Sequence, residues 1–390
     1  MHIADQILAM KPLLTEWRHD LHAHPETAFQ EHRTAAFIAS ELREMGLEVH
    51  EGIGGTGVVG ILRNGEGRSV GLRADIDALD IEEDTGLPYA STVAGKMHAC
   101  GHDGHTVMLL GAARHMAANP PGSGTVVFIF QPAEENEGGA RVMIEDGLFD
   151  RFPVDQVFAL HNWPGLAEGR FAVHDGPVMA AFDTFELRLI GRGGHGAMPH
   201  QTIDPITVAA QVQMAWQNIV SRVVDPTDPA VISITQVHGG DALNVIPERI
   251  VLRGTTRSFR PETRDLLEAE MTHRARHVAE AYHATAEFDY QRRYPATINS
   301  PASTGVARAA AEAVAGDQEL MTGLAPSMAA EDFAFMLQTV PGAYIWLGNG
   351  DAGAGRNLHS PHYRFNDGIL PIGVQYFTEV TVRALRGENV

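Results

Sequence analysis

The sequence contains little cysteine, few positive charges and no long apolar run. A single cysteine in 390 residues excludes an intramolecular disulfide, as is typical of a reducing compartment. The 29 Lys and Arg residues are outnumbered by 49 Asp and Glu residues, and the net charge of −20 argues against binding to a nucleic-acid backbone. There is no apolar stretch of about 18 residues and no secretory-signal pattern at the N-terminus. We therefore expect a cytoplasmic protein with no nucleic-acid or membrane partner.

Histidine, by contrast, is plentiful. Many of the 20 histidines lie in irregular stretches rich in glycine and proline, where backbone freedom usually serves a site. The 44% hydrophobic content is that of a folded globular protein. At about 150 residues per domain, the chain is long enough for two domains.

The pattern of apolar residues changes twice along the chain. Up to residue 181, continuous apolar runs such as 124–130 and 156–160 alternate with helical segments, which predicts an α/β domain with a largely parallel sheet. Alternating strands and two long helices then predict a compact α+β domain with one solvated sheet face. We therefore predict a discontinuous domain, 1–181 plus 294–390, interrupted by a smaller domain over 182–293. The elements expected in the insert are strands at 185–191, 230–237, 249–256 and 286–292 and helices at 206–223 and 261–283.

The segment MHACGHDGH, residues 97–105, combines metal-ligand side chains with glycine. Cys100 and His102 are two residues apart, so both can point at one metal only if the backbone bends tightly, and Gly101 and Gly104 permit that bend. The alternative is a buried cysteine beside solvent-exposed histidines. We predict a metal role for this segment.

Two adjacent carboxylates, Glu134 and Glu135, follow the apolar run 124–130. Neighbouring side chains in a loop point in different directions, so one carboxylate can bind a metal while the other acts as a general base. A solvated acidic loop is the alternative. Because sites in open α/β sheets form outside the carboxyl ends of strands, we favour the functional interpretation.

Further candidate histidines occur at the end of a predicted strand and in a loop near the C-terminus. His161 ends a predicted buried strand, where a hydrogen-bonded core histidine is the alternative to a ligand. His359 and His362 lie in a loop that contains Pro361, ahead of the final predicted helix.

Together these segments offer one thiolate, three imidazoles and one carboxylate. This mixed set suits Zn²⁺ and tolerates Mn²⁺, Co²⁺ or Ni²⁺. Five protein ligands and a water are too many for one tetrahedral zinc, and they fit two ions about 3.5–4 Å apart. We therefore predict two divalent metal ions per chain, with Zn²⁺ preferred.

Motifs spread from about residue 71 to 367 resemble those of the M20 metallopeptidase family. The similarity is greatest to its aminoacylase, hippurate hydrolase and auxin-conjugate amidohydrolase branch, because most relatives outside that branch have Asp where Cys100 stands. The motifs are LRADIDAL, MHACGHDGH, FQPAEENEGGA, GRGGHGAMPH, NVIPE, AAEDFA and LHSPHYRFND.

The resemblance implies a zinc-exopeptidase-like, three-layer α/β catalytic domain with an inserted α+β lid or dimerisation domain. It also implies that Cys100 bridges two metal ions and that Glu134 is the general base and proton shuttle. His359, and not His362, matches the family's ligand. The metal ligands implied in this way are Cys100, His102, Glu135, His161 and His359.

Other candidates are less specific. In the insert, His195 lies in a glycine-rich turn and is a candidate to stabilise an oxyanion. Asn244 and Arg260 are candidates to bind the substrate carbonyl or carboxylate, although a surface ion pair is an equally good interpretation of Arg260. Asp75 and Asp77 are expected to orient ligand imidazoles, with a purely structural hydrogen bond as the alternative for each.

The resemblance implies a function as well. We expect metal-dependent hydrolysis of N-acyl amino acids, of the N-acetyl or N-benzoyl type, to a carboxylic acid and a free amino acid. The partners would be the small-molecule substrate and further copies of the chain, as a homodimer or higher homo-oligomer through the insert. The alternatives are a dipeptidase or aminopeptidase on the same scaffold, and an inactive binding protein. The intact ligand set and Glu134 count against an inactive protein.

Overall fold

The computed structural model describes residues 1–135 and 137–387, which fall into two compact units. The larger unit is discontinuous and comprises Met1–Val178, Ile298–Ala325 and Asp332–Val390. The smaller unit comprises Met179–Thr297 and Pro326–Glu331. None of the helices in the described chain has both the length and the apolar character needed to cross a membrane.

The larger unit is built on a seven-stranded mixed sheet in the order β1-β2-β4-β3-β5-β15-β6. The four strands β4, β3, β5 and β15 are parallel, whereas the pairs β1–β2, β2–β4 and β15–β6 are antiparallel. The strands are β1 (Glu48–Ile53), β2 (Gly57–Asn64), β3 (Ser69–Asp75), β4 (Gly124–Gln131), β5 (Gln156–Pro164), β6 (Phe171–Ala172) and β15 (Gly342–Gly350).

The prediction of a largely parallel sheet is therefore wrong at the edges. Only a short turn separates β1, which was not predicted, from β2. A parallel connection needs a crossover of about a dozen residues or more, so this turn can form only an antiparallel hairpin. The centre of the sheet is parallel, as predicted.

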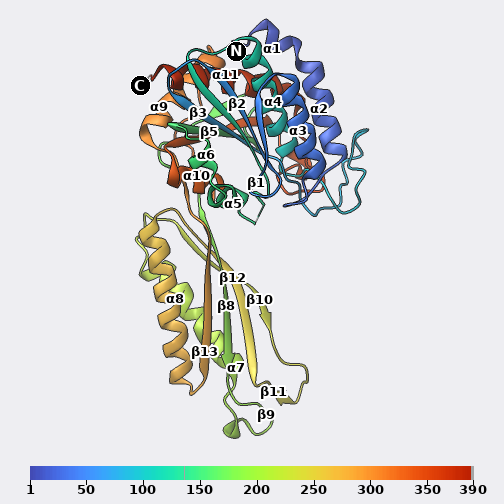
Figure 1. The fold of residues 1–390 in the computed structure, drawn as a ribbon. Helices are drawn as coiled ribbons and strands as arrows, with labels where there is room; N and C mark the ends of the chain where they lie inside the picture. The colour runs from blue at the N-terminus through green and yellow to red at the C-terminus, as the bar shows by residue number, and fades with distance from the viewer. Residues whose placement is uncertain (136, 388–390) are drawn as a thin grey trace. The chain divides into compact units, whose positions relative to one another are not determined.

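Helices lie on both faces of the sheet of the larger unit (Figure 1). Alternate residues of the central strands face these two helical layers. Phe128 and Phe158 belong to the core formed with the helices α1, α2, α3, α4, α9 and α11. Tyr344 points the other way, and its ring lies 5.9 Å from that of Phe333 on α10. The sheet is thus the middle of three layers, which confirms the predicted fold class. The helices are α1 (Asp5–Ala9), α2 (Lys11–Ala23), α3 (His32–Glu44), α4 (His102–Ala118), α5 (Gly139–Glu145), α6 (Leu148–Arg151), α9 (Pro301–Ala315), α10 (Phe333–Thr339) and α11 (Leu370–Arg386).

The smaller unit has a four-stranded antiparallel sheet in the order β10-β12-β8-β13, packed against α7 and α8. Helix α7 begins where sequence signals place it, because the Asp204 carboxylate accepts the N–H of Ile206 and Pro205 occupies the first turn. The fully buried Trp216 lies in the apolar core between sheet and helices. The elements are β8 (Ala181–Ile190), β9 (Gly194–His195), α7 (Pro205–Arg222), β10 (Ala230–His238), β11 (Val245–Ile246), β12 (Arg249–Ser258), α8 (Pro261–Ala281) and β13 (Thr285–Tyr294). Two short strands, β7 (Pro177–Met179) and β14 (Thr297–Ile298), each contain residues of both units.

Each strand and helix predicted in the insert is present, with ends that differ by a few residues. The separate domain over 182–293 and its role as a lid or dimerisation domain stay predictions.

Candidate metal centre

The turn that enters α4 depends on two glycines. Gly101 has a φ of 93°, in the left-handed region that favours glycine, and a Cβ there would collide with Asn162 and the hydroxyl of Tyr363. A Cβ on Gly104 would collide with the ring of Phe365. The glycines of MHACGHDGH therefore permit close packing around this turn as well as its tight bend.

His102 has one ring nitrogen in use and one available. Its Nδ1 lies 2.9 Å from the carbonyl oxygen of Asp77 and 3.1 Å from Asp77 Oδ1. Both oxygens accept hydrogen bonds, so Nδ1 carries the proton. The buried Nε2 has no hydrogen-bond partner among the described residues. A histidine that binds a metal needs one ring nitrogen that is buried and makes no hydrogen bond, while the other ring nitrogen is held by a carboxylate.

His161 is arranged in the same way. Its Nδ1 donates to the carbonyl oxygen of Asn162 at 2.6 Å, so in the neutral ring Nε2 is unprotonated, and it lies 3.4 Å from Cys100 Sγ. Burial, followed by the nearby His105, holds the pKa of His161 well below its usual value, which favours the neutral ring. His161 was predicted to end its strand, but it lies inside β5. The strand continues to Pro164, because the pairing with β15 extends through His161, which lies opposite Trp346, to Pro164.

The two adjacent carboxylates lie on a turn after β4 that the fold holds in a strained conformation. Ala133 has a φ of 52°, unusual for a residue with a side chain, and its N–H donates to Glu31 Oε1 at 2.9 Å. Glu135 is held through its N–H, which donates to Asp77 Oδ2 at 3.0 Å. Glu134 is only 6% exposed, and one of its carboxylate oxygens accepts the N–H of Asp332 at 3.3 Å. The two carboxylates are thus separately oriented.

His359 also has a left-handed backbone, with a φ of 62°. Its N–H donates to the carbonyl oxygen of Ala99 at 2.8 Å, and its Nε2 lies 3.1 Å from Glu135 Oε1. Hydrogen bonds to Cys100 and to Glu135 raise the pKa of His359 to about 10. Burial, and then the charge of Glu135, raises the pKa of the Cys100 thiol. A thiolate at this position therefore needs a cation beside it.

Potential ligand atoms form two overlapping groups, in each of which the atoms lie within 4.8 Å of one another. One contains Cys100, Glu135 and His359, and the other contains His102, Glu134 and Glu135. Glu135 belongs to both groups, so its carboxylate lies where it could contact two neighbouring ions. The thiolate, imidazole and carboxylate donors fit Zn²⁺ and similar divalent ions.

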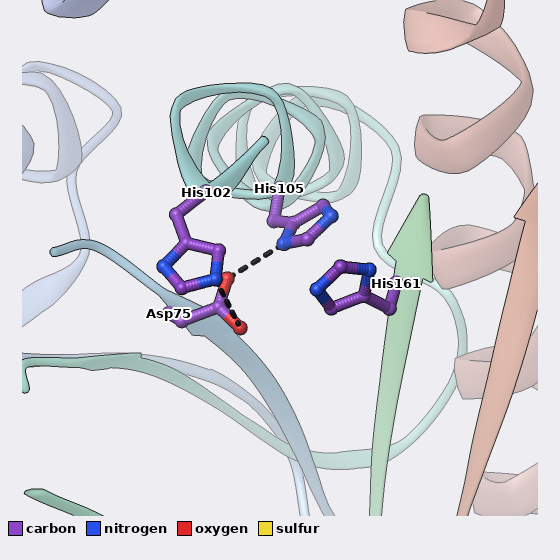
Figure 2. Close-up of side chains that lie close together, drawn as sticks. All are labelled: Asp75, His102, His105 and His161. Carbon is purple, nitrogen blue, oxygen red and sulfur yellow. Dashed lines mark hydrogen bonds and ion pairs between the residues drawn. The ribbon is translucent and has the colours of Figure 1, made fainter. Parts of the chain in front are cut away.

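A third group, Asp75 with His102, His105 and His161, is shown in Figure 2. His105 Nδ1 donates to Asp75 Oδ1 at 2.6 Å, and its Nε2 accepts the N–H of Asn162 at 3.0 Å. With both nitrogens engaged, His105 orients its neighbours and is not available as a ligand.

Sequence reasoning missed His105 and Asn162 as supporting residues. Asn162 Nδ2 donates to the carbonyl oxygen of Cys100 at 2.6 Å, and its Oδ1 accepts from the hydroxyl of Tyr363 at 2.7 Å. The histidine spacing in MHACGHDGH was the available signal, because residues three apart share a helix face.

Asp75 and Asp77 differ in what they contact. Asp77 binds His102, as an orienting carboxylate should. Asp75 binds His105 and, at 2.8 Å, Arg73, and its Oδ2 is 3.7 Å from His102 Nε2.

The remaining candidates belong to the smaller unit. His195 lies in β9, and its Nδ1 accepts the N–H of Ala197 at 3.0 Å, so in the neutral ring the exposed Nε2 carries the proton. Asn244 is adjacent, since its carbonyl oxygen accepts the N–H of Gly196 at 2.7 Å.

The structure does not bring Arg260 to this pair. It follows the far end of β12, a ten-residue strand of about 33 Å that begins near Asn244. Its side chain is 61% exposed and lies 3.6 Å from Glu262. The surface ion pair is therefore the interaction that Arg260 makes within this unit.

The chain is similar to known hydrolases along nearly its whole length. The profile of peptidase family M20/M25/M40 matches residues 71–383. Hippurate hydrolase of Campylobacter jejuni is 39% identical over 99% of this chain and 100% of its own length. N-acetyl-L-cysteine deacetylase of Bacillus subtilis is 39% identical over 95% of this chain and 88% of its own. The Bacillus subtilis YXEP protein, a dinuclear metal-binding peptidase from the M20 family, has a TM-score of 0.85 and 35% identity over 98% of this chain and 100% of that chain.

Proposed function

Since this chain belongs to peptidase family M20/M25/M40 and is an amidohydrolase, we propose that it removes the acyl group from N-acyl amino acids. The products would be a carboxylic acid and a free amino acid. The observation that carries the proposal is the group of thiol, imidazole and carboxylate donors around Glu135, next to a separately oriented Glu134. The names of the two hydrolase relatives, one acting on hippurate and one on N-acetyl-L-cysteine, support this substrate class.

We assign two divalent ions to this centre, with Zn²⁺ preferred and Mn²⁺, Co²⁺ or Ni²⁺ as alternatives. The His102 Nε2, which makes no hydrogen bond among the described residues, and the His161 ring, whose pKa is held well below its usual value by burial, support these two residues as ligands. The ions would supply positive charge that polarises the substrate carbonyl and makes a water acidic enough to attack at neutral pH. The proposed ligands are Cys100, His102, Glu135, His161 and His359.

Glu134 is the proposed general base. Its carboxylate is nearly buried beside Glu135, which keeps it close to the donors without making both carboxylates equivalent. It would accept the proton of the attacking water and return it to the leaving amine, as one group can do in both steps of amide hydrolysis.

Substrate contacts are proposed for the smaller unit. His195 has the proton on its exposed Nε2, which suits donation to an oxyanion. Asn244 lies beside it. Arg260 stays a proposed carboxylate-binding residue on the strength of its side-chain chemistry alone. We also propose a cytoplasmic location and assembly as a homodimer or higher homo-oligomer.

Metal analysis combined with a substrate panel tests the proposal. The purified chain should contain about two divalent ions, and a chelator should abolish turnover that added Zn²⁺ or Mn²⁺ restores. N-acetyl and N-benzoyl amino acids should be hydrolysed faster than free dipeptides. The reverse preference would make the chain a dipeptidase or aminopeptidase, and metal binding without turnover on either class would favour a binding protein. Turnover that survives metal removal would refute the metal mechanism.

A further inference from the structure

Arg18, on helix α2, is a charged side chain that is only 1% exposed and lies between two segments that carry proposed ligands. Its Nη1 donates to Asp103 Oδ2 at 3.0 Å, and its Nε donates to Asp367 Oδ1. Asp103 directly follows His102 in the segment 97–105. Asp367 ends the segment 357–367, which carries His359. One guanidinium therefore binds both segments.

The surroundings of Arg18 fix its orientation. Its guanidinium carbon lies 4.9 Å from the centre of the Tyr89 ring and 5.5 Å from that of Phe365, which itself belongs to 357–367. Such contacts with aromatic faces favour a planar cation.

Two histidines of the same helix bind the same carboxylates. His22 Nδ1 lies 2.9 Å from Asp103 Oδ2, and His19 Nε2 lies 2.9 Å from Asp367 Oδ2. Each carboxylate thus has two partners on α2.

A buried charge network of this kind is a poor way to gain stability. Removing a guanidinium and a carboxylate from water is unfavourable, and well-packed apolar residues are often as stable or more so. What the network supplies is geometry, since a guanidinium holds its donors in a rigid plane. Besides this network, the two segments are joined by the bond from the His359 N–H to the carbonyl oxygen of Ala99 and by the hydrogen bond between the side chains of His359 and Cys100.

We propose that Arg18 is a positioning residue for the metal centre: by binding Asp103 and Asp367 together, it fixes the segment of Cys100 and His102 relative to that of His359. Arg18 acts through these carboxylates, and its effect appears in metal affinity and geometry. The inference rests on the proposed metal ligands but not on the identity of the substrate.

Arg18→Lys in the full chain is the test, because lysine keeps the positive charge and lacks the planar fork. The matched control is Arg264→Lys in the smaller unit, where the guanidinium likewise donates to a buried carboxylate, Asp183, with Nε at 2.9 Å. For each protein, the dissociation constants of Zn²⁺ and Co²⁺ are measured by competition with a chelator. The Co²⁺ absorption spectrum reports ligand geometry, including the band from a Cys100 thiolate. The midpoint of thermal unfolding is measured with and without metal.

Arg18→Lys should weaken binding of at least one Zn²⁺ ion by about 10- to 100-fold, the range expected for groups that orient ligands. It should also change the Co²⁺ spectrum and reduce the rise in unfolding temperature that Zn²⁺ produces. Arg264→Lys should lower the unfolding temperature of the metal-free protein while leaving the Zn²⁺ and Co²⁺ dissociation constants unchanged.

A second variant, Asp367→Asn, protects the test against a failure of Arg18→Lys to fold, since this carboxylate is 24% exposed. It should weaken Zn²⁺ binding with little change in the stability of the metal-free protein. Wild-type metal affinity and spectrum in Asp367→Asn, and in Arg18→Lys if it folds, would overturn the inference. Absence of metal binding by the wild-type chain would instead overturn the proposed metal centre.

Discussion

The two units of the chain both bury charge, but among the described residues only the larger unit has a buried ring nitrogen in its charged cluster that makes no hydrogen bond. In the smaller unit, Asp183 is buried and accepts from Arg264, from the hydroxyl of Tyr290 at 2.8 Å and from the N–H of Arg293 at 3.0 Å. In the larger unit, the buried His102 Nε2 has no hydrogen-bond partner among the described residues. A buried carboxylate that is fully hydrogen-bonded indicates structure, whereas a buried imidazole nitrogen that makes no hydrogen bond while its partner nitrogen is held by a carboxylate is suited to a metal ligand. Burial alone does not distinguish the two.

The comparison extends to exposed candidates. In the larger unit Glu134 and the proposed ligands Cys100, His102 and His161 are buried and His359 is exposed, while His195 and Asn244 of the smaller unit are both exposed. If the larger unit holds the metal and the smaller unit only contacts substrate, substitutions in the smaller unit should change turnover and leave the metal content unchanged.

The largest effect should follow from Glu134→Gln. Loss of a general base should lower kcat by about 10²- to 10⁴-fold, while the metal content measured by elemental analysis stays near two ions per chain. Glu137→Gln, an exposed carboxylate three residues further on, is the control and should leave kcat unchanged. A near-normal kcat in Glu134→Gln would remove this residue from the mechanism.

His195→Ala should have the next largest effect. Loss of a hydrogen-bond donor to an oxyanion costs about 10²- to 10³-fold in kcat, and metal affinity should not change. His200→Ala changes another exposed histidine nearby and should leave kcat intact. Loss of metal from His195→Ala would contradict the assignment of separate tasks to the two units.

The smallest effect concerns the stability of the turn that carries Glu134. Burial raises the pKa of Glu31 to about 7. The hydrogen bond from the Thr56 hydroxyl lowers this pKa, but its effect is smaller than that of burial. Because the folded-state pKa exceeds the ordinary value of 4.5, the contribution of Glu31 to stability is complete below about pH 4.5 and is lost as the pH rises through about 7. In Glu31→Gln, the unfolding temperature of the metal-free protein should therefore fall less across this interval than in the wild type.

The control for this prediction is Glu280→Gln, an exposed carboxylate on α8. It should reproduce the wild-type dependence of the unfolding temperature on pH. An unchanged pH dependence in Glu31→Gln would show that the Glu31 carboxyl titrates alike in the folded and unfolded chain.

Apolar periodicity predicted the central strands over 124–130 and 156–160 and the strands and helices of the insert, because it reports directly on burial. The parallel centre of the sheet followed from the alternation of strands with helices. The antiparallel edges were not predicted, because strand direction there depends on which strands become neighbours. β1 and α10 were missed: Glu48–Ile53 is mostly exposed, and α10 is only seven residues long.

By itself, the sequence determined the proposed set of donors, because Cys, His and Glu occur in short segments with glycine at the bends. Only the tertiary structure decided how those donors are used. The Asp77 bond selects the tautomer of His102, and bonds to Asp75 and Asn162 make His105 a supporting residue. The length of β12 separates Arg260 from Asn244. The physical reason is the same each time: a side chain's chemistry is local, whereas its available atoms depend on partners brought to it from distant parts of the chain.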